Sequence, residues 1–400
     1  MFSLPRFAVN LLLVLAPSAF ALGQAAPRDF HFDSSSQTSI PLSDQSIFEA
    51  TINGKGPFKL FFDTGANVNI LNPEVIAQLG LTPEGDQTEL HGFSGGALDA
   101  KPYRADQLRI GDLVLTGQTF FSVPMPQPVI GIVGAVGYEL MSRLIIKADN
   151  ERHQLTLYDP AHFVYNGAGE KLALLPDQLG LIVHARIGKV SGQFILDTGA
   201  VGSIGVGVNH WFAKQKHIPN HLFHFLYHGV FSGGADGNAP AATLDRIKTL
   251  CLGAACVPGI VGEFSDGDDK SQFAGRIGND VLSRFTFTID WRRRAIYLEK
   301  TSHWRQTTVY NQTGLDLNPP DSPAGSNGAF VVATVYPRSP ASKARIRVGD
   351  RILLIDNRPP RPTWYSDDPA FLQPAGTVVT VTIQRGNATQ QIKLKLKDIL

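Results

Sequence analysis

The sequence Phe61-Phe62-Asp63-Thr64-Gly65-Ala66 occurs a second time, at an offset of 134 residues (197 − 63), as Ile195-Leu196-Asp197-Thr198-Gly199-Ala200. In both copies a short apolar run precedes Asp-Thr-Gly-Ala. Apolar runs of this length that are bounded by Gly or Pro turns are typical of buried strands. We therefore expect Asp63 and Asp197 each to follow directly on a buried strand, in two copies of one structural unit.

Two further blocks recur in the same order. A glycine-rich block around Phe93 returns around Phe231, an offset of 138 (231 − 93), and the block that starts at Val136 returns at Ile277, an offset of 141 (277 − 136). Three ordered blocks with slowly growing offsets are hard to obtain by chance. They predict two similar lobes, over residues 28–160 and 161–303, built mainly from short strands. Short helices are expected at Pro73–Leu79, with Asn72 as the cap, and at Asn209–Lys216.

The repeated Asp residues are the best candidates for chemistry. A single Asp in a turn often has no chemical role, but a matched pair from a duplicated unit favours catalysis. Two carboxyl groups within hydrogen-bonding distance cannot both ionise, so they share one proton and titrate as a pair. The ionised member can act as a base towards water while the protonated member polarises a carbonyl group. Asp63 and Asp197 are therefore the predicted catalytic residues.

Two lobes, each with Asp-Thr-Gly-Ala, a glycine-rich hairpin and a later hydrophobic-Gly pair, resemble the aspartic proteases. The motif is similar to that of the retroviral enzymes, here duplicated in one chain as in pepsin-like proteases, over roughly residues 40–300. The resemblance implies a mainly β, bilobal acid-protease fold with pseudo-twofold symmetry, which hydrolyses polypeptides with water held between the two Asp residues. It also implies that further loop residues support the pair: Thr64, Gly65, Ala66, Thr198, Gly199 and Ala200.

The glycine-rich hairpins would be flaps that close over an extended substrate and exclude water. The flap residues expected to contact substrate are Gly92, Phe93, Ser94, Gly95, Gly229, Phe231, Ser232 and Gly233. The alternative is that these glycines are ordinary loop residues. Pepsin-like enzymes usually have Ser or Thr after Asp-Thr-Gly and a Tyr on one flap. Ala66, Ala200 and Phe93 stand at these places, which weakens the expectation of a strongly acidic pH optimum.

The last part of the chain, residues 304–400, has a different pattern. Ser339-Pro340-Ala341 followed by Gly349-Asp350-Arg351-Ile352 resembles bacterial PDZ domains, although Arg345 stands where a Gly is usual. The resemblance implies a small α+β domain that binds a peptide as an added strand and holds its terminal carboxylate. The implied peptide-binding residues are Gly328, Ala329 and Phe330. The alternative is a structural cap that binds nothing.

The N-terminal residues have the pattern of a secretory signal peptide over residues 1–21. Arg6 precedes an apolar run at 7–17, and Ala19-Phe20-Ala21 follows. The run falls short of the roughly 18 residues that a membrane anchor needs, and no later segment is long enough. We therefore expect a periplasmic or secreted protein without a transmembrane segment in the mature chain. In an oxidising compartment, Cys251 and Cys256 are expected to form a disulfide across a hairpin.

Charge balance and histidine spacing bear on two further classes of function, nucleic-acid binding and metal binding. The 36 Lys and Arg nearly balance the 35 Asp and Glu, so no charge excess points to nucleic acid. Four histidines at helix-like spacing could in principle hold zinc: His217, His221, His224 and His228. Pro219 interrupts such a helix, however, and no carboxylate or Cys has a matching spacing. We therefore expect no metal and no cofactor.

The interpretation that accounts for most of these features is an exported aspartic endopeptidase with a C-terminal PDZ domain that docks peptide or protein C-termini. Two alternatives remain open from the sequence. One is a non-catalytic peptide-binding or scaffold protein that keeps the protease cleft with a misaligned Asp pair. The other is a metallohydrolase that uses the histidines.

Overall fold

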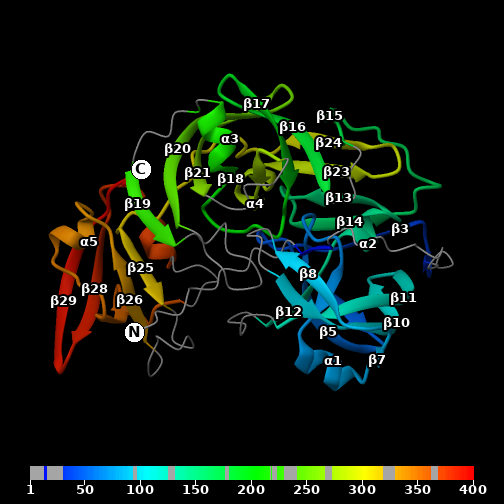
Figure 1. Ribbon diagram of the computed structural model, residues 1–400, viewed down its shortest axis with the longest axis horizontal. Coiled ribbons are helices and arrows are strands. Elements are labelled where there is room, and N and C mark those ends of the chain that lie inside the picture. The colour runs from blue at the N-terminus through cyan, green and yellow to red at the C-terminus, as the bar shows by residue number, and fades with distance from the viewer. Residues whose placement is uncertain are drawn as a thin grey trace.

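The computed structural model describes residues 13–15, 30–92, 97–124, 131–175, 180–216, 218, 223–228, 241–265, 273–318, 329–361 and 368–400. These residues are mainly in strands and form two lobes and a C-terminal domain (Figure 1). The predicted fold class, a bilobal β protein followed by a small PDZ-like domain, is confirmed. None of the helices within the described ranges is long and apolar enough to cross a membrane.

Lobe 1 is built on an eight-stranded sheet of order β2-β11-β6-β12-β5-β4-β10-β7. Its strands are β2 (Phe30–Phe32), β4 (Ile47–Ile52), β5 (Lys55–Phe62), β6 (Asn69–Leu71), β7 (Thr82–Pro83), β10 (Pro102–Ile110), β11 (Leu113–Ser122) and β12 (Ile132–Val136). Strand β5 ends at Phe62, directly before Asp63, as predicted, and β12 pairs with it in parallel. Helix α1 (Pro73–Leu79) also has the predicted bounds, because the Asn72 side chain accepts a hydrogen bond from the Glu74 N–H.

A separate three-stranded sheet of order β1-β8-β9 accompanies lobe 1. Its strands are β1 (Leu13–Leu15), β8 (Thr88–Gly92) and β9 (Ala97–Ala100). Strands β8 and β9 pair antiparallel up to His91 and Ala97, as the predicted hairpin requires. Strand β1 falls inside the predicted signal peptide and pairs antiparallel with β8.

Lobe 2 repeats the arrangement in a seven-stranded sheet of order β16-β17-β22-β18-β21-β20-β19. Its strands are β16 (Leu181–Ile187), β17 (Val190–Leu196), β18 (Val206–Asn209), β19 (Phe223–His228), β20 (Ala241–Leu252), β21 (Ala255–Ser265) and β22 (Gly275–Ile277). Strand β17 ends directly before Asp197 and pairs in parallel with β22, just as β5 pairs with β12. The helix expected at 209–216 is α3 (His210–Gln215), capped by the Asn209 side chain.

A six-stranded sheet of order β15-β24-β23-β13-β14-β3 joins the two lobes. Its strands are β3 (Gln37–Pro41), β13 (Ile145–Asp149), β14 (Gln154–Tyr158), β15 (Glu170–Ala173), β23 (Phe285–Asp290) and β24 (Ala295–Lys300). Strand β13 of the first repeat pairs antiparallel with β23 of the second. Because this sheet takes strands from both halves, the lobes are held in one fixed relation.

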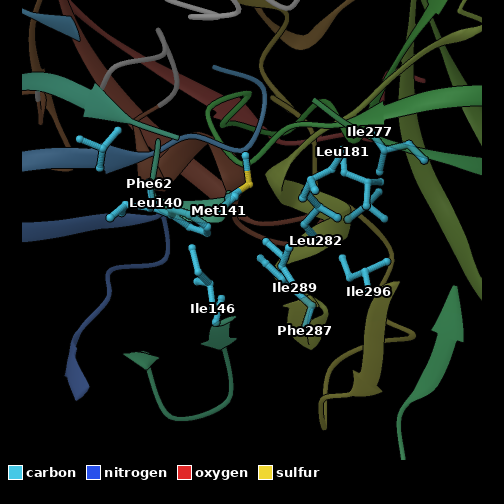
Figure 2. Packing of buried hydrophobic residues seen from close by; sticks show 14 of the residues in the cluster. Phe62, Leu140, Met141, Ile146, Leu181, Ile277, Leu282, Phe287, Ile289 and Ile296 are labelled. Atoms are coloured by element: carbon cyan, nitrogen blue, oxygen red, sulfur yellow. The ribbon is translucent and has the colours of Figure 1, made fainter. Parts of the chain in front are cut away.

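The helices before β13 and β23 are α2 (Tyr138–Met141) and α4 (Asn279–Leu282). Met141 from α2 and Leu282 from α4 belong to one buried hydrophobic cluster, together with Phe62 and Ile277 from the strands of the two motifs (Figure 2). Burial of aliphatic and aromatic side chains at this junction stabilises the pairing of the lobes by roughly 1.5–3 kcal/mol for each side chain. The two Asp-Thr-Gly loops therefore start from strands that share one core.

The C-terminal domain is a five-stranded sheet of order β25-β26-β27-β28-β29 with its own hydrophobic core. Its elements are β25 (Leu315–Asn318), β26 (Phe330–Val335), α5 (Pro340–Lys343), β27 (Arg351–Ile355), the 3₁₀ helix η1 (Pro369–Leu372), β28 (Val378–Arg385) and β29 (Ala388–Lys395). Arg345, which replaces the usual Gly, has φ of 61°. Its carbonyl oxygen accepts a hydrogen bond of 3.0 Å from Arg385.

The C-terminal domain packs against lobe 2. Tyr336, which follows β26, belongs to a buried cluster with Ala200 and Ile204 from the segment after Asp197. Arg246 on β20 adds polar contacts, because its guanidinium donates to the Thr308 carbonyl (3.0 Å) and to both carboxylate oxygens of Asp398 (3.1 and 3.0 Å). The loop that carries one candidate catalytic residue is therefore in contact with the C-terminal domain.

We expect Arg246→Ala to loosen this attachment. The change removes the hydrogen bonds to Thr308 and Asp398 and leaves a part-buried carbonyl without its donor, which costs roughly 1–3 kcal/mol. Calorimetry should therefore resolve an earlier transition of the C-terminal domain, and limited proteolysis should cut sooner between the domains. Asp398→Asn keeps the carbonyl contact of Arg246 and should have a smaller effect. Unchanged unfolding and cleavage in Arg246→Ala would contradict this role.

Candidate active site

The duplicated strands bring Asp63 and Asp197 to equivalent places. The Asp63 N–H donates to the Val136 carbonyl, and the Asp197 N–H donates to the Ile277 carbonyl, both at 2.9 Å. Both Asp side chains are fully buried, at 0% exposure. The backbone of each loop is therefore anchored to the neighbouring parallel strand of its own lobe.

The two Thr side chains connect the loops across the lobes. The Thr64 N–H donates to Thr198 Oγ1 and the Thr198 N–H donates to Thr64 Oγ1, each at 3.0 Å. In return, Thr64 Oγ1 donates to the Leu196 carbonyl (2.8 Å) and Thr198 Oγ1 donates to the Phe62 carbonyl. Every bond crosses between lobes and all of the groups are buried. This reciprocal set holds the two loops in register, so Thr64 and Thr198 support the Asp pair, as the resemblance implied.

The residues after each Thr orient the carboxylates. Gly65 and Ala66 donate backbone N–H groups to Asp63 Oδ1 at 2.9 and 3.1 Å, and Ala200 donates to Asp197 Oδ1 at 3.0 Å. Gly199 lies directly against the other lobe's carboxyl group, because a Cβ at this position would be 2.4 Å from the Asp63 carboxyl carbon. Only glycine leaves room for this approach.

Burial raises the pKa of the Asp63 carboxyl well above its usual range, and the negative charge of Asp197 and a hydrogen bond with it act in the same direction. The Gly65 N–H and, more weakly, the Arg276 charge oppose the rise. The two carboxyl groups are thus near enough to act on each other's charge, and two like charges in a buried site favour a state in which only one of them is ionised. The arrangement can provide one acidic and one basic oxygen to the same reacting group.

Arg276 is the part of this site that the sequence reasoning missed. Its Nη1 donates to Asp197 Oδ2 at 2.8 Å, and both side chains are fully buried. Burial lowers the pKa of Arg276, while the charges of Asp197, Asp63 and Glu263 raise it. A signal was present in the sequence, since Arg276 occupies the repeat position that is Ala135 in lobe 1. This position lies just outside the recurring block, which starts at Val136 and at Ile277.

The flap prediction is tested only in part. Gly92 is the last residue of β8. The other predicted flap residues, Phe93, Ser94, Gly95, Gly229, Phe231, Ser232 and Gly233, lie outside the described residues. The hairpin partners β19 and β20 pair antiparallel up to His228 and Ala241. The flap role of these residues stays a prediction.

The histidines do not form the helical stripe considered above. His224 and His228 lie in strand β19, so a spacing of four residues does not place them one helical turn apart. His217 and His221 lie outside the described residues. Within the described ranges, no three His, Cys, Asp or Glu side chains gather in a way that could hold a metal ion. Cys251 and Cys256 face each other in the β20–β21 hairpin and are joined by a disulfide.

The predicted peptide-binding residues of the C-terminal domain, Gly328, Ala329 and Phe330, stay a prediction. Ala329 and Phe330 are buried, and β26, which begins at Phe330, has β25 on one side and β27 on the other. Val331, near the start of β26, therefore has strand partners on both sides. Strand β25, the neighbour of β26, is an edge strand of the sheet, and among the described strands none pairs with its outer edge. Gly328 lies outside the described residues.

Comparisons with known proteins cover both the structure and the sequence of the chain. A crystal structure of an aspartic proteinase from Irpex lacteus aligns with 68% of this chain and 99% of its own, at 13% identity and a TM-score of 0.46. No curated protein matches the chain in sequence. Residues 48–136 match the family model described as aspartyl protease, and residues 331–385 match the model described as PDZ domain. Lobe 1 is thus similar to aspartyl proteases, and the C-terminal domain is similar to PDZ domains.

Proposed function

We propose that the protein is an aspartic endopeptidase that hydrolyses polypeptides with water activated by Asp63 and Asp197. The observation that carries this proposal is the buried pair of carboxyl groups held by reciprocal Thr64–Thr198 hydrogen bonds. A scaffold with a misaligned pair would have no need for matched hydrogen bonds to both carboxylates. The match of residues 48–136 to the aspartyl protease model supports the same reaction class.

In the proposed reaction the ionised carboxylate takes a proton from water as the water oxygen attacks the peptide carbonyl carbon. The protonated carboxyl gives its proton to the carbonyl oxygen, so the product of this step is a neutral tetrahedral diol. The diol then collapses with cleavage of the C–N bond. One proton moves to the leaving nitrogen, and the products are a carboxylic acid and an amine. No bond to the enzyme forms.

The direct test is incubation with an unfolded protein, followed by mass spectrometry of the fragments. We expect cleavage that a statine-type diol mimic abolishes, because the mimic reproduces the tetrahedral intermediate. EDTA should leave cleavage intact. Inhibition by EDTA with no effect of the diol mimic would instead favour the metallohydrolase alternative, and no cleavage at all would leave a peptide-binding scaffold.

We further propose that the C-terminal domain binds the C-terminal segment of a polypeptide along the outer edge of β25. A peptide bound as an added strand gains backbone hydrogen bonds from that edge, and PDZ-type sites also bind the terminal carboxylate. Amidating the C-terminus of a bound peptide should therefore weaken binding by about tenfold or more, measured by calorimetry with the full chain. An equal affinity for the acid and the amide would contradict this mode.

Export to the periplasm or outside the cell is also part of the proposal. Arg6, the apolar run at 7–17 and the Ala19-Phe20-Ala21 pattern support it. The disulfide between Cys251 and Cys256 fits an oxidising compartment. N-terminal sequencing of the mature protein tests it, with cleavage after Ala21 or near Ala25 as the expected result.

A further inference from the structure

A row of three residues runs across the sheet of lobe 2 beside the candidate catalytic pair. Gly207 on β18 pairs with Glu263 on β21 and, on its other side, with Arg276 on β22. Paired residues on neighbouring strands project their side chains from the same face. Glu263 and Arg276 therefore flank a position without a side chain. Both are fully buried, and the charge of Glu263 acts on Arg276. We call Glu263, Gly207 and Arg276 the charged row.

Lobe 1 has the same three positions with a different chemistry. Ile70 on β6 pairs with Phe121 on β11 and with Ala135 on β12, in the same strand directions as the charged row. These residues contribute to a hydrophobic cluster of lobe 1. We call Phe121, Ile70 and Ala135 the apolar row. The duplication thus supplies an internal comparison: of these two rows, the one in lobe 2 holds a cation in contact with its Asp, and the one in lobe 1 is apolar.

The middle position of the two rows differs in its side chain. Ile70 carries an aliphatic side chain at this place in the apolar row, whereas Gly207 carries none in the charged row. Arg276, next to Gly207, reaches Asp197, with 2.8 Å between Nη1 and Oδ2. A guanidinium keeps its charge in proteins even when it is buried. Burying it costs several kcal/mol unless anions surround it, and Asp197, Asp63 and Glu263 are the groups that act on it here.

We propose that Arg276 is a positioning residue that keeps Asp197 ionised, so that Asp63 holds the shared proton. This inference rests on the proposed peptidase function and assigns the roles within it. Asp197 is then the base that takes the proton from water, and Asp63 is the acid that protonates the peptide carbonyl. Glu263, the anion of the charged row, balances the Arg276 charge.

The surroundings of the two carboxyl groups support this division. Asp197 makes a charge-assisted hydrogen bond with Arg276, which favours its ionised form. Asp63 accepts backbone N–H bonds from Gly65 and Ala66, which oppose its protonation, but it makes no ion pair with any described residue, and the Arg276 charge affects it only weakly. Burial and the neighbouring Asp197 charge favour the protonated form of Asp63. Arg276 therefore breaks the symmetry that the duplicated motifs would otherwise give the pair.

The test compares pH–rate profiles of the full-length protein. Arg276→Met combined with Glu263→Gln removes both charges of the row, so that Glu263 is not left as a buried carboxylate without its cation while Asp197 loses its partner. We expect the acidic limb of kcat/KM to move to higher pH by roughly 1–3 units, because the cation that favours ionisation is gone. Arg276→Lys keeps a cation at this place, so its acidic limb should lie close to that of the wild type. KM should change little in any of these variants. Glu263→Gln alone should move the limb the other way.

Two results would overturn the proposal. One is a pH profile of the double variant that matches the wild type, since a structural role alone would leave the profile in place. The other is a double variant that is more active at every pH, which would make the ion pair inhibitory.

A second measurement separates this inference from the proposed reaction. In Asp63→Asn protein with ¹³C-labelled aspartate, NMR can follow the Asp197 carboxyl without any cleavage assay. Adding the double substitution should raise the midpoint of its titration by at least one pH unit. An unchanged midpoint overturns the role of Arg276 even if the enzyme cleaves peptides. A raised midpoint supports the role of Arg276 even if the protein does not cleave peptides.

Discussion

Replacing either Asp63 or Asp197 by Asn should lower peptide-bond hydrolysis by roughly 10²–10⁴-fold, the usual contribution of a positioned acid or base. Asn cannot accept the proton of the attacking water or donate one to the carbonyl in the same way. Each carboxyl group is buried and aligned by backbone N–H groups, so the isosteric change keeps most of these contacts. Initial rates on an unfolded protein substrate, with folding verified by circular dichroism, measure the loss.

Asp106→Asn is a suitable control because Asp106 is exposed on β10, and its substitution should leave the rate unchanged. Equal fragment patterns for the wild type and both dyad variants would remove the peptidase assignment. Loss of activity in only one variant would also contradict it, since the mechanism needs one acid and one base.

The Asp63 variant should also change stability in a pH-dependent way. Because burial raises the pKa of Asp63, the folded state binds its proton more tightly than the unfolded chain does. This contribution is complete below the unfolded value of about 3.9 and is lost as pH rises through the higher folded pKa. Asp63→Asn cannot lose a proton. Its free energy of unfolding should therefore exceed that of the wild type at high pH, by about 1.4 kcal/mol for each unit of the pKa rise. Urea unfolding at several pH values measures the difference, and an advantage only at low pH would contradict it.

The second large effect is expected from the threonines. Thr198→Val removes the hydroxyl that accepts from the Thr64 N–H and donates to the Phe62 carbonyl, so two buried backbone groups lose their partners. At roughly 1–3 kcal/mol for each group, the free energy of unfolding should fall by about 2–6 kcal/mol. Activity should fall as well, because the loops that carry the two Asp residues lose their register. Chemical denaturation and cleavage assays measure the two effects.

The reciprocal hydrogen bonds also predict that Thr64 and Thr198 stabilise the protein as one unit. Thr64→Val removes the other two bonds, so a double-mutant cycle should give a coupling energy of about 0.5–3 kcal/mol between Thr64 and Thr198. Thr51→Val, on half-buried strand β4, should change stability by no more than about 0.5 kcal/mol. If the effects of Thr64→Val and Thr198→Val on the free energy of unfolding were strictly additive, the two threonines would not form one unit.

Local signals in the sequence predicted much of what the structure contains. Asn72 followed by Pro73 predicted the start of α1, because a cap and the first turn of a helix depend on adjacent residues. The apolar runs before Asp63 and Asp197 predicted buried strands for the same reason. The spacing of the histidines was misleading, because it fits a helix only if the backbone is helical, and His224 and His228 lie in a strand.

The duplication, and with it the pairing of two Asp-Thr-Gly loops, could be read from the sequence alone, because repeated sequence implies repeated local structure. The tertiary structure decided what surrounds that pair. Arg276 is 79 residues from Asp197 in the chain and reaches it because β22 lies beside β17, the strand that ends directly before Asp197. Which edge of the C-terminal sheet is open was likewise decided by strand order, which no single segment encodes. Contacts between distant strands depend on how sheets assemble, and short sequence patterns carry no record of that assembly.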